Sequence, residues 1–476
     1  MKNIVEVIQS ETSSYPNKLA IIDGKREVTY TELLTAVKRA SEELKKLAIN
    51  TGKRVALLCE DSIDYVILSL AVLRLSAVIV PVPLASSKEE IETVLKEMKV
   101  NFLIFEKGAY VSHKAKRLKI KCGLGKEFSF LWRPSAGNPR EEFFSLNPAF
   151  IRFSSGTTGV RKGVIISHEA IIQRTDAADK GLQVTSDDTV LWVLSMSFHF
   201  VVTILLFLRR GATIILAESV FPEGLLMALR EHRPSFVYAS PLHYHLLSGL
   251  DVVPHEALAK VRIAVSTAIK LPLEIAGMFH AKFGIELSEA YGIIEVGLPF
   301  INTSQNKSKR GSVGRILPDY ELKMVNVDKE GVGEIYLKGK GLFDAYFSPW
   351  QKANEVLRDG WFNTGDIGSL DQDGFLSILG RANNIINFNG MKIFPQEVEC
   401  VLNRHPAVKE SFVYAVPHPE YGQLPNAKIV LKKAKTKFDL NEVRRFCYRH
   451  LAPYKVPKEF CCVSCLDKTP SGKVKL

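Results

Sequence analysis

Residues 153–163 have the types and spacing that phosphate binding requires. They read Phe-Ser-Ser-Gly-Thr-Thr-Gly-Val-Arg-Lys-Gly and follow an apolar strand predicted over 149–153. Small residues let the backbone approach a ligand while N–H, hydroxyl and ammonium groups face anionic oxygens. This is not a Walker A loop, because Lys162 precedes Gly163 and a predicted strand. A Ser/Gly-rich surface loop is the alternative. The candidate phosphate-binding residues are Ser154, Ser155, Gly156, Thr157, Thr158, Gly159 and Lys162.

The elements around this loop alternate between short apolar runs and amphipathic stretches from residue 17 to about 260. Such alternation predicts a covered, parallel sheet in an α/β fold. A helix is expected to start near Thr31, and residues 106–147 are expected to form a surface excursion. Short β-runs over 311–380 predict a β-rich subdomain, and 381–476 predict a small α+β unit.

Composition excludes several classes of protein. With 476 residues, 46% hydrophobic and 24% charged, the chain is globular and long enough for two or more domains. Seven cysteines, an odd number, argue against a disulfide framework, and no secretory signal is visible, so a cytoplasmic location is expected. Cys461, Cys462 and Cys465 lack a second ligand pair, so positions on the face of a strand are favoured over a metal site.

Residues 190–208 carry no formal charge and imitate a membrane span. Ser195, Ser197, His199 and Thr203 interrupt the segment, which favours a buried strand, turn and helix over an integral membrane segment. The net charge of +12 is also uneven, since 382–476 hold 16 Lys/Arg against 8 Asp/Glu. No nucleic-acid-binding pattern accompanies this surplus, so an anionic cofactor or acidic carrier protein is the expected partner.

Further motifs occur in order after the phosphate loop. They are Tyr291-Gly-Ile-Ile-Glu295, Gly311-Ser-Val-Gly-Arg315, Gly333-Glu-Ile335, Trp361-Phe-Asn-Thr-Gly-Asp366, Gly380-Arg381, Gly390-Met-Lys-Ile-Phe-Pro-Gln-Glu-Val-Glu399 and Pro470-Ser-Gly-Lys473. Together they resemble the adenylate-forming superfamily of acyl-CoA synthetases, nonribosomal-peptide adenylation domains and firefly luciferase. The character is closest to an acyl- or aryl-CoA ligase, an enzyme that uses ATP, Mg²⁺ and coenzyme A (CoA).

The resemblance implies a role for each matching residue. Lys473 would contact the reacting carboxylate and the α-phosphate, and Glu295 would hold Mg²⁺. Asp366 and Arg381 would bind the ribose hydroxyls, and Tyr291 would stack on adenine. The remaining nucleotide-binding positions would be Thr267, Ala268, Ala290, Gly292 and Ile294.

The resemblance also implies two domains and a rotation between half-reactions. Residues 1–380 would form the N-terminal adenylation core, and 381–476 a mobile C-terminal domain with its hinge near Asn383. Rotation would remove Lys473 and bring the Gly390 loop to the site for acyl transfer to a thiol. That thiol would belong to CoA or to a phosphopantetheinylated carrier protein.

Two departures and one retained residue shape the prediction. Ile294 stands where the family usually has a Thr that contacts the α-phosphate, and Ser266–Ile269 are bulkier than the usual Gly-rich stretch. Residues 197–202 lack the Asp that holds an amino-acid substrate, whereas His199 matches a position that flanks the carboxylate in acyl- and aryl-CoA ligases. A satisfied core histidine is the alternative.

The resulting prediction is an ATP-dependent acid–thiol ligase that forms an acyl-AMP and then an acyl thioester. Phe198, Phe200, Val201, Ile293 and Ile294 predict an apolar pocket for a fatty or aromatic acid, as in fatty acid metabolism. One alternative is an enzyme that loads an acyl carrier protein. Another is a catalytically weak protein that binds nucleotide or acyl-adenylate.

Overall fold

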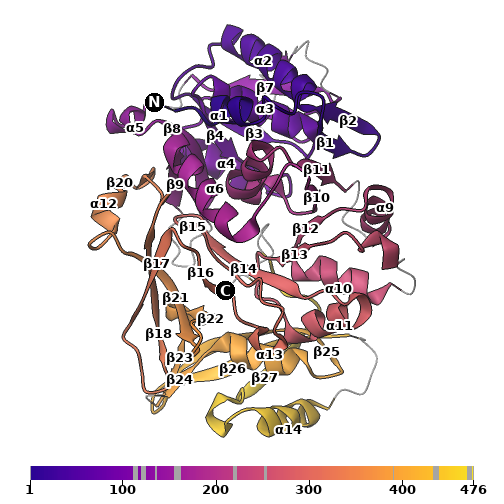
Figure 1. Cartoon of the computed structure of the whole chain (residues 1–476). Helices are drawn as coiled ribbons and strands as arrows, with labels where there is room; N and C mark the ends of the chain where they lie inside the picture. Colours follow the sequence, from indigo (N-terminus) through magenta and orange to yellow (C-terminus); the bar gives the residue numbers. More distant parts are fainter. Residues whose placement is uncertain are drawn as a thin grey trace. The chain divides into compact units, whose positions relative to one another are not determined.

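A computed structural model describes residues 2–110, 116–118, 125–134, 137–154, 162–217, 222–250, 255–389, 391–432, 439–468 and 474. The chain forms two compact units (Figure 1). The first comprises Met1–Leu322 and Leu337–Phe362, and the second comprises Lys323–Tyr336 and Asn363–Leu476. The predicted boundary at residue 380 and the hinge near Asn383 concern a rotation between domains and remain predictions.

The first sheet of the first unit has, within the described residues, nine strands in the order β16-β15-β14-β13-β12-β10-β11-β1-β2. Its six central strands, from β14 to β1, are parallel, as predicted from the alternating pattern. The strands are β1 (Leu19–Asp23), β2 (Arg26–Thr29), β10 (Thr189–Trp192), β11 (Thr213–Leu216), β12 (Phe236–Ala239), β13 (Ile263–Ser266), β14 (Leu287–Ile293), β15 (Gly297–Ile301) and β16 (Arg315–Ile316).

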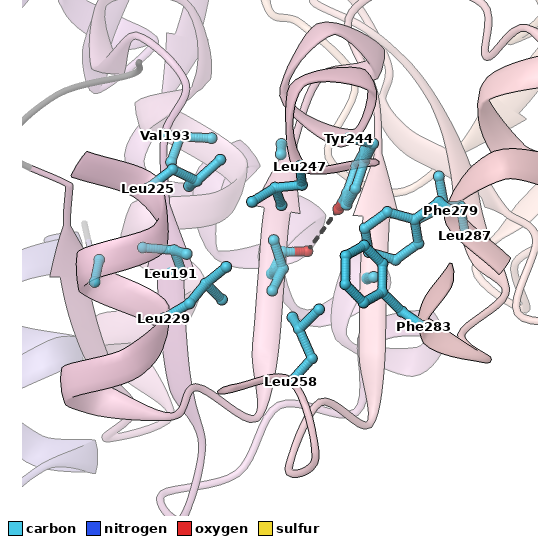
Figure 2. Packing of buried hydrophobic residues seen from close by; sticks show 14 of the residues in the cluster. Leu191, Val193, Leu225, Leu229, Tyr244, Leu247, Leu258, Phe279, Phe283 and Leu287 are labelled. Atoms are coloured by element: carbon cyan, nitrogen blue, oxygen red, sulfur yellow. Dashed lines mark hydrogen bonds between the residues drawn. The ribbon is translucent and has the colours of Figure 1, made fainter. Parts of the chain in front are cut away.

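Helices α9 (Pro222–His232), α10 (Pro241–Gly249) and α11 (Leu273–Phe283) contribute to the hydrophobic core on one face of this sheet. Figure 2 shows Leu225 and Leu229 packed beside Leu191, and Phe279 and Phe283 packed beside Tyr244. The buried Tyr244 hydroxyl donates to the carbonyl oxygens of Val237 at 3.3 Å and Val265 at 2.8 Å. The core therefore satisfies its tyrosine and fixes α10 on the strands.

The second sheet of the first unit has, in the described chain, the order β20-β19-β9-β8-β4-β3-β5-β7-β6. Strands β8, β4, β3 and β5 are parallel, and the strands toward both edges pair antiparallel. The strands are β3 (Arg54–Leu58), β4 (Val78–Pro81), β5 (Phe102–Glu106), β6 (Lys116–Leu118), β7 (Phe128–Trp132), β8 (Pro148–Ser154), β9 (Lys162–Ser167), β19 (Ala345–Tyr346) and β20 (Gln351–Lys352).

Six further helices complete the N-terminal part of this unit, with a short helix later in the chain. They are α1 (Ile4–Glu11), α2 (Tyr30–Lys46), α3 (Ile63–Arg74), α4 (Lys88–Glu97), α5 (Glu142–Ser145) and α6 (His168–Leu182), followed later by α12 (Ala353–Val356). Helix α4 adds Ile91, Val94 and Leu95 to the core of the second sheet.

Two local predictions were wrong. Thr29, not Thr31, caps α2, because the Thr29 hydroxyl accepts from the Glu32 N–H while the Glu32 carboxylate accepts from the Thr29 N–H. The excursion expected over 106–147 contains β6 and β7, which extend the second sheet. Their pairing partners are distant in sequence, so local periodicity did not reveal them.

The uncharged segment 190–208 folds as predicted, as a strand, a turn and a helix. After β10, the helical run consists of α7 (Met196–His199), a π-helical turn (Phe200–Ile204) and α8 (Leu205–Arg209). Among the described residues, no helix has the length and hydropathy needed to cross a membrane. Single π-turns inside helices occur frequently at functional sites.

The second unit contains most of the third sheet, β17-β18-β21-β22, and the fourth sheet, β24-β23-β26-β25 with β27 beside β26. The strands are β17 (Tyr320–Val325), β18 (Val332–Gly339), β21 (Phe362–Leu370), β22 (Leu376–Arg381), β23 (Ile386–Phe388), β24 (Met391–Ile393), β25 (Val408–His418), β26 (Gly422–Leu431) and β27 (Glu459–Val463). Helices α13 (Pro395–Asn403) and α14 (Leu440–His450) supply buried residues to the core of the fourth sheet.

Cys461 and Cys462 lie in β27, as predicted, and both are exposed. No cluster of three or more metal-ligating side chains occurs in the described part of the chain.

Candidate active site

Candidate residues of the first sheet follow the carboxyl ends of its parallel strands. His199 follows β10, Thr267 and Ala268 follow β13, and Tyr291 lies near the carboxyl end of β14. Strands β13 and β14 are in register at Ser266 and Glu289, so they end at the same edge. Open α/β sheets bind ligands outside this edge.

The residues expected to surround adenine lie close together at this edge. The Thr267 hydroxyl donates to the Ala290 carbonyl at 3.2 Å, which joins the ends of β13 and β14. Tyr291 is partly exposed, with its ring 6.1 Å from that of Phe300, and Gly292 is exposed. Ala268 is exposed and has a φ of 76°, a conformation that favours glycine.

Glu295 occupies the tip of the hairpin between β14 and β15. The turn is closed by the Val296 N–H, which donates to the Ile293 carbonyl at 3.1 Å. The Phe343 N–H donates to the Glu295 carbonyl at 2.8 Å, and Arg174 Nη1 donates to the Ile294 carbonyl at 3.1 Å. The backbone of the tip is therefore held from two other segments.

Arg174 is 1% exposed and makes two further bonds from α6. Its Nε and Nη2 donate to the Gly341 carbonyl at 2.9 and 2.6 Å. Gly341 has a φ of 69°, and a Cβ there would lie 2.6 Å from the Arg174 nitrogen, so only glycine fits. The Ile294 side chain has no hydroxyl, but its backbone carbonyl accepts a hydrogen bond from Arg174.

Tyr346 and Lys162 accompany the Glu295 carboxylate. The Tyr346 hydroxyl donates to Glu295 Oε1 at 3.3 Å, and the Lys162 ammonium lies 4.2 Å from the centroid of the Tyr346 ring. Burial and the nearby Glu295 carboxylate raise the pKa of Tyr346, so its hydroxyl remains a donor at neutral pH. In the register of the second sheet, Tyr346 and Arg152 flank Val164, which places these side chains on one face.

The Glu295 environment fits Mg²⁺ bound together with a nucleotide. A single carboxylate cannot fill the octahedral shell of Mg²⁺, and no group of three ligands occurs among the described residues. Mg²⁺ commonly takes one or two carboxylates and completes its shell with phosphate oxygens and water. Glu295 supplies one such carboxylate, and the Lys162 ammonium contacts the same Tyr346 side chain.

His199 ends the short helix α7 after β10. The Asp61 carboxylate positions this helix by accepting from the Met196 N–H at 3.0 Å with both oxygens. The His199 ring lies edge-on to Trp192, with the ring centroids 6.1 Å apart. Burial, with a further contribution from the Arg152 charge, lowers the pKa of His199 to about 3, so the imidazole is neutral at physiological pH.

Arg152 is a residue that the sequence analysis passed over. It lies in β8, in the strand predicted only as apolar, and its guanidinium stands 5.3 Å from the centroid of the Phe198 ring. Burial lowers the pKa of Arg152 to about 10, and the nearby Glu295 carboxylate opposes this shift. The available signal was a charged residue inside an apolar strand directly before the Ser/Gly loop.

The apolar residues expected around the acid divide into two groups. Phe198, Val201, Ile293 and Ile294 are partly exposed at the site. Phe200 is 2% exposed and packs against Tyr65 and Phe150, with ring centroids at 5.7 and 5.9 Å. Phe200 is therefore a core residue in this structure.

In the second unit, Asp366 and Arg381 face each other across β21 and β22. Arg381 Nε lies 2.9 Å from Asp366 Oδ1, and Arg381 Nη1 donates to the Thr364 carbonyl at 2.8 Å. The Asp366 N–H donates to the Thr364 hydroxyl at 3.0 Å. Asn383, the expected hinge, is exposed in a short 3₁₀ turn (Ala382–Asn384) directly after β22.

Several predicted residues lie outside the described residues. Ser154 ends β8, whereas the rest of the predicted phosphate loop before Lys162 is not described. The predicted residues concerned are Ser155, Gly156, Thr157, Thr158, Gly159, Gly390 and Lys473.

Comparison with known proteins identifies the family. The family model named AMP-binding enzyme matches residues 8–347, and that of the AMP-binding enzyme C-terminal domain matches residues 397–473. The chain therefore belongs to the AMP-binding enzyme family, which confirms the predicted adenylate-forming resemblance. It is an enzyme of the acid–thiol ligase class, the AMP-forming acyl-CoA synthetases.

Individual relatives cover the whole chain at low identity. The chain is 28% identical to a 2-succinylbenzoate–CoA ligase from Listeria monocytogenes, over 98% of this chain and 97% of the relative. It is 25% identical to a long-chain-fatty-acid–CoA ligase from Bacillus subtilis, over 99% and 93%. Identity at this level leaves the acid substrate open.

Solved structures share the fold. The ATP-bound MatB from Rhodopseudomonas palustris matches with a TM-score of 0.84 at 23% identity, covering 99% of this chain and 97% of that chain. The o-succinylbenzoate CoA synthetase from Bacillus subtilis, solved with its acyl-adenylate, also gives 0.84 at 23%, covering 98% and 96%. These matches confirm the predicted α/β fold with a large N-terminal domain and a small C-terminal domain.

Proposed function

We propose that this enzyme activates an apolar fatty or aromatic acid with ATP and then transfers the acyl group to CoA. The observation that carries the proposal is the convergence of His199, Thr267, Tyr291 and Glu295 at the carboxyl edge of one sheet. The names of the relatives, which include fatty-acid and succinylbenzoate ligases, support the reaction class.

In the first step, a carboxylate oxygen of the acid attacks the α-phosphorus of ATP. A new O–P bond forms, and the bond to pyrophosphate breaks with its electron pair leaving on the pyrophosphate oxygen. Two anions must approach each other, so cationic groups directed at the transition state are required. Lys162 and Lys473 supply this charge in the proposal.

The nucleotide is held by the residues that the family resemblance implies. Tyr291 stacks on adenine, with Thr267, Ala268, Ala290, Gly292 and Ile294 around it, while Ser154–Gly159 bind the phosphates. Asp366 accepts from the ribose hydroxyls, and Arg381 orients its carboxylate through their ion pair. Glu295 holds Mg²⁺, which when bound offsets the negative charge on the phosphate oxygens.

The acid lies beside the segment 196–201. His199 is neutral, so its ring can donate a hydrogen bond to a carboxylate without a full positive charge. Phe198 and Val201 offer apolar surface to the rest of the acid. No acidic side chain occurs in residues 197–202, which disfavours a substrate with an ammonium group.

In the second step, a thiolate attacks the acyl carbon, the thioester bond forms and AMP leaves. Asn383 acts as the hinge that exchanges Lys473 for the Gly390 loop. CoA carries three phosphates, and the +8 surplus of residues 382–476, from 16 Lys/Arg against 8 Asp/Glu, suits it. Acidic carrier proteins fit the same surplus and are the second candidate. A cytoplasmic location belongs to this proposal.

The test is product analysis by mass spectrometry. The enzyme is incubated with ATP, Mg²⁺ and a panel of fatty and aromatic acids, with CoA in one series and a holo-carrier protein in another. Acyl-CoA together with AMP supports the proposal, whereas acylated carrier without acyl-CoA supports the second candidate. Nucleotide binding without AMP formation in either series contradicts both and favours a binding protein, with Ile294 as the first residue to exchange for Thr.

A further inference from the structure

Four arginines of the first unit are partly or wholly buried, and they differ in the acceptors available to their N–H groups. Arg54, Arg174 and Arg209 are at most 4% exposed, and all three make several hydrogen bonds. Arg209, for example, pairs with Glu11 through Nε at 2.9 Å and Nη2 at 2.6 Å. Arg152 makes no hydrogen bond or ion pair with any residue in the described part of the chain, and its charged face meets only the Phe198 ring.

Arg54 is the closest comparison. Its guanidinium donates to the carbonyl oxygens of Lys99 at 2.9 Å, Gly52 at 3.2 Å and Gly137 at 2.9 Å. Burial lowers the pKa of Arg54 to about 10, the same value as for Arg152. Burial thus lowers the pKa of both guanidinium groups, but among the described residues only Arg54 has hydrogen-bond acceptors.

A partly buried guanidinium without acceptors is unfavourable, because those of its five N–H donors that lose water gain no partner. Unlike Arg54, Arg152 keeps part of its surface exposed, so a ligand can reach it. A planar carboxylate matches the fork of a guanidinium with two parallel hydrogen bonds. The arrangement therefore indicates that an anionic group of a ligand accepts hydrogen bonds from Arg152.

The surroundings of Arg152 point to the acid rather than to the nucleotide. Phe198 and His199 belong to the segment proposed to contact the acid, and the Arg152 charge acts on His199. Arg152 also shares one face of the second sheet with Tyr346, which donates to Glu295, the proposed Mg²⁺ ligand.

We propose that Arg152 binds a carboxylate of the acid substrate beside Phe198 and His199. This inference rests on the proposed function of the same site. The carboxylate has two sources: the one that is adenylated, or a second carboxylate that stays on the acyl product. In the first case Arg152 is a positioning residue for every acid, and in the second it selects dicarboxylic acids.

The experiment compares Arg152→Met and Arg152→Lys with wild type in ATP–pyrophosphate exchange, using monocarboxylic and dicarboxylic acids of equal chain length. Arg152→Met should raise the KM for the acid about tenfold or more and leave the KM for ATP unchanged, with partial recovery in Arg152→Lys. A loss with both kinds of acid identifies the adenylated carboxylate. A loss confined to dicarboxylic acids identifies a second carboxylate.

Arg54→Met is the matched control, because it removes a buried arginine away from the site. It should lower the melting temperature and leave the KM for the acid unchanged, whereas Arg152→Met should keep the wild-type melting temperature. If Arg152→Met does not fold, Arg152→Gln takes its place in the same assays.

An unchanged KM for every acid overturns the proposal, and so does a KM increase confined to ATP, which would assign Arg152 to the phosphates. If the wild type shows no acid-dependent exchange, the proposed function fails and calorimetry decides about Arg152. Binding of the acids to wild type but not to Arg152→Met retains the inference, whereas no binding, or equal binding to both, overturns it.

Discussion

The hairpin tip at Glu295 and the wall formed by Arg152 and residues 196–200 differ in how their polar groups are satisfied. At the tip, Arg174 and Phe343 bind the backbone carbonyls, and Tyr346 donates to the carboxylate. At the wall, the Arg152 guanidinium has no hydrogen-bond partner within the described residues. The backbone of the tip is therefore held by the protein itself, whereas the donors of Arg152 at the wall have no acceptor among the described residues.

This difference suggests that the tip positions a metal ion and that the wall recognises the anionic group of a ligand. A tip that is rigid in advance can hold a metal ion without reorganising, which lowers the cost of the chemical step. A wall with unfilled donors gains its stabilisation only when an acceptor arrives, which makes binding selective for anionic groups. Removing Arg174, which holds the backbone of the tip, should therefore lower stability, whereas removing Arg152 should weaken ligand binding.

The largest expected effect is that of Arg174→Met. Loss of three charged hydrogen bonds to buried carbonyls should reduce the free energy of unfolding by about 4 kcal/mol, measured by urea denaturation. Arg152→Met should change it by less than about 1 kcal/mol, because it removes no hydrogen bond. Equal losses of unfolding free energy in Arg174→Met and Arg152→Met would contradict the proposed difference between the tip and the wall.

Glu295→Gln should act on catalysis and leave folding intact. The amide keeps the shape of the side chain and an oxygen for Tyr346 but loses the charge that Mg²⁺ requires, so exchange should fall about 100-fold. Glu321→Gln, an exposed residue of β17, is the control and should have wild-type activity. Wild-type exchange in Glu295→Gln would exclude Glu295 as the metal ligand.

Tyr346→Phe should have a smaller effect on the same assay. Its hydroxyl contributes one hydrogen bond of 3.3 Å to Glu295, worth about 1 kcal/mol, so exchange should fall about fivefold. The Phe ring keeps the contact with Lys162. A loss as large as that of Glu295→Gln would mean that Tyr346 itself contacts the reacting groups.

The smallest effect concerns the ionisation of His199, measured by NMR titration of the imidazole. Its pKa of about 3 keeps the ring neutral above pH 5, and Arg152→Met should raise this pKa without restoring the ordinary 6.5, because burial is the larger cause. The sign for folding follows from the lowered pKa. As the pH falls below 6.5, His199 binds a proton in the unfolded chain but not in the folded protein, so the free energy of unfolding decreases. A wild-type His199 pKa near 6.5 would contradict the claim that burial lowers the pKa of this ring.

The sequence predicts much of the fold because the parallel strands and helices carry strong local patterns. Segment 190–208 illustrates this, since four polar residues in an uncharged run distinguished a buried strand and helix from a membrane span. Strands β6 and β7 were missed because their partners are fixed by non-local pairing. The cap at Thr29 depended on a reciprocal bond with Glu32 that competes with the alternative at Thr31.

The site was predicted by motif rather than by environment. Glu295, His199 and Asp366 could be named from motifs, but their partners Arg174, Tyr346 and Asp61 come from distant segments. Arg152 shows the same limit, because a strand pattern places it in a sheet without revealing that its donors lack acceptors. Such facts depend on packing between segments far apart in the chain.

Acid-dependent ATP–pyrophosphate exchange, measured with fatty, aromatic and amino acids, shows whether the enzyme adenylates an apolar acid. We expect exchange with apolar fatty or aromatic acids, none with amino acids, and loss of exchange in Lys473→Ala. An enzyme that binds nucleotide but shows no exchange with any acid would contradict this expectation.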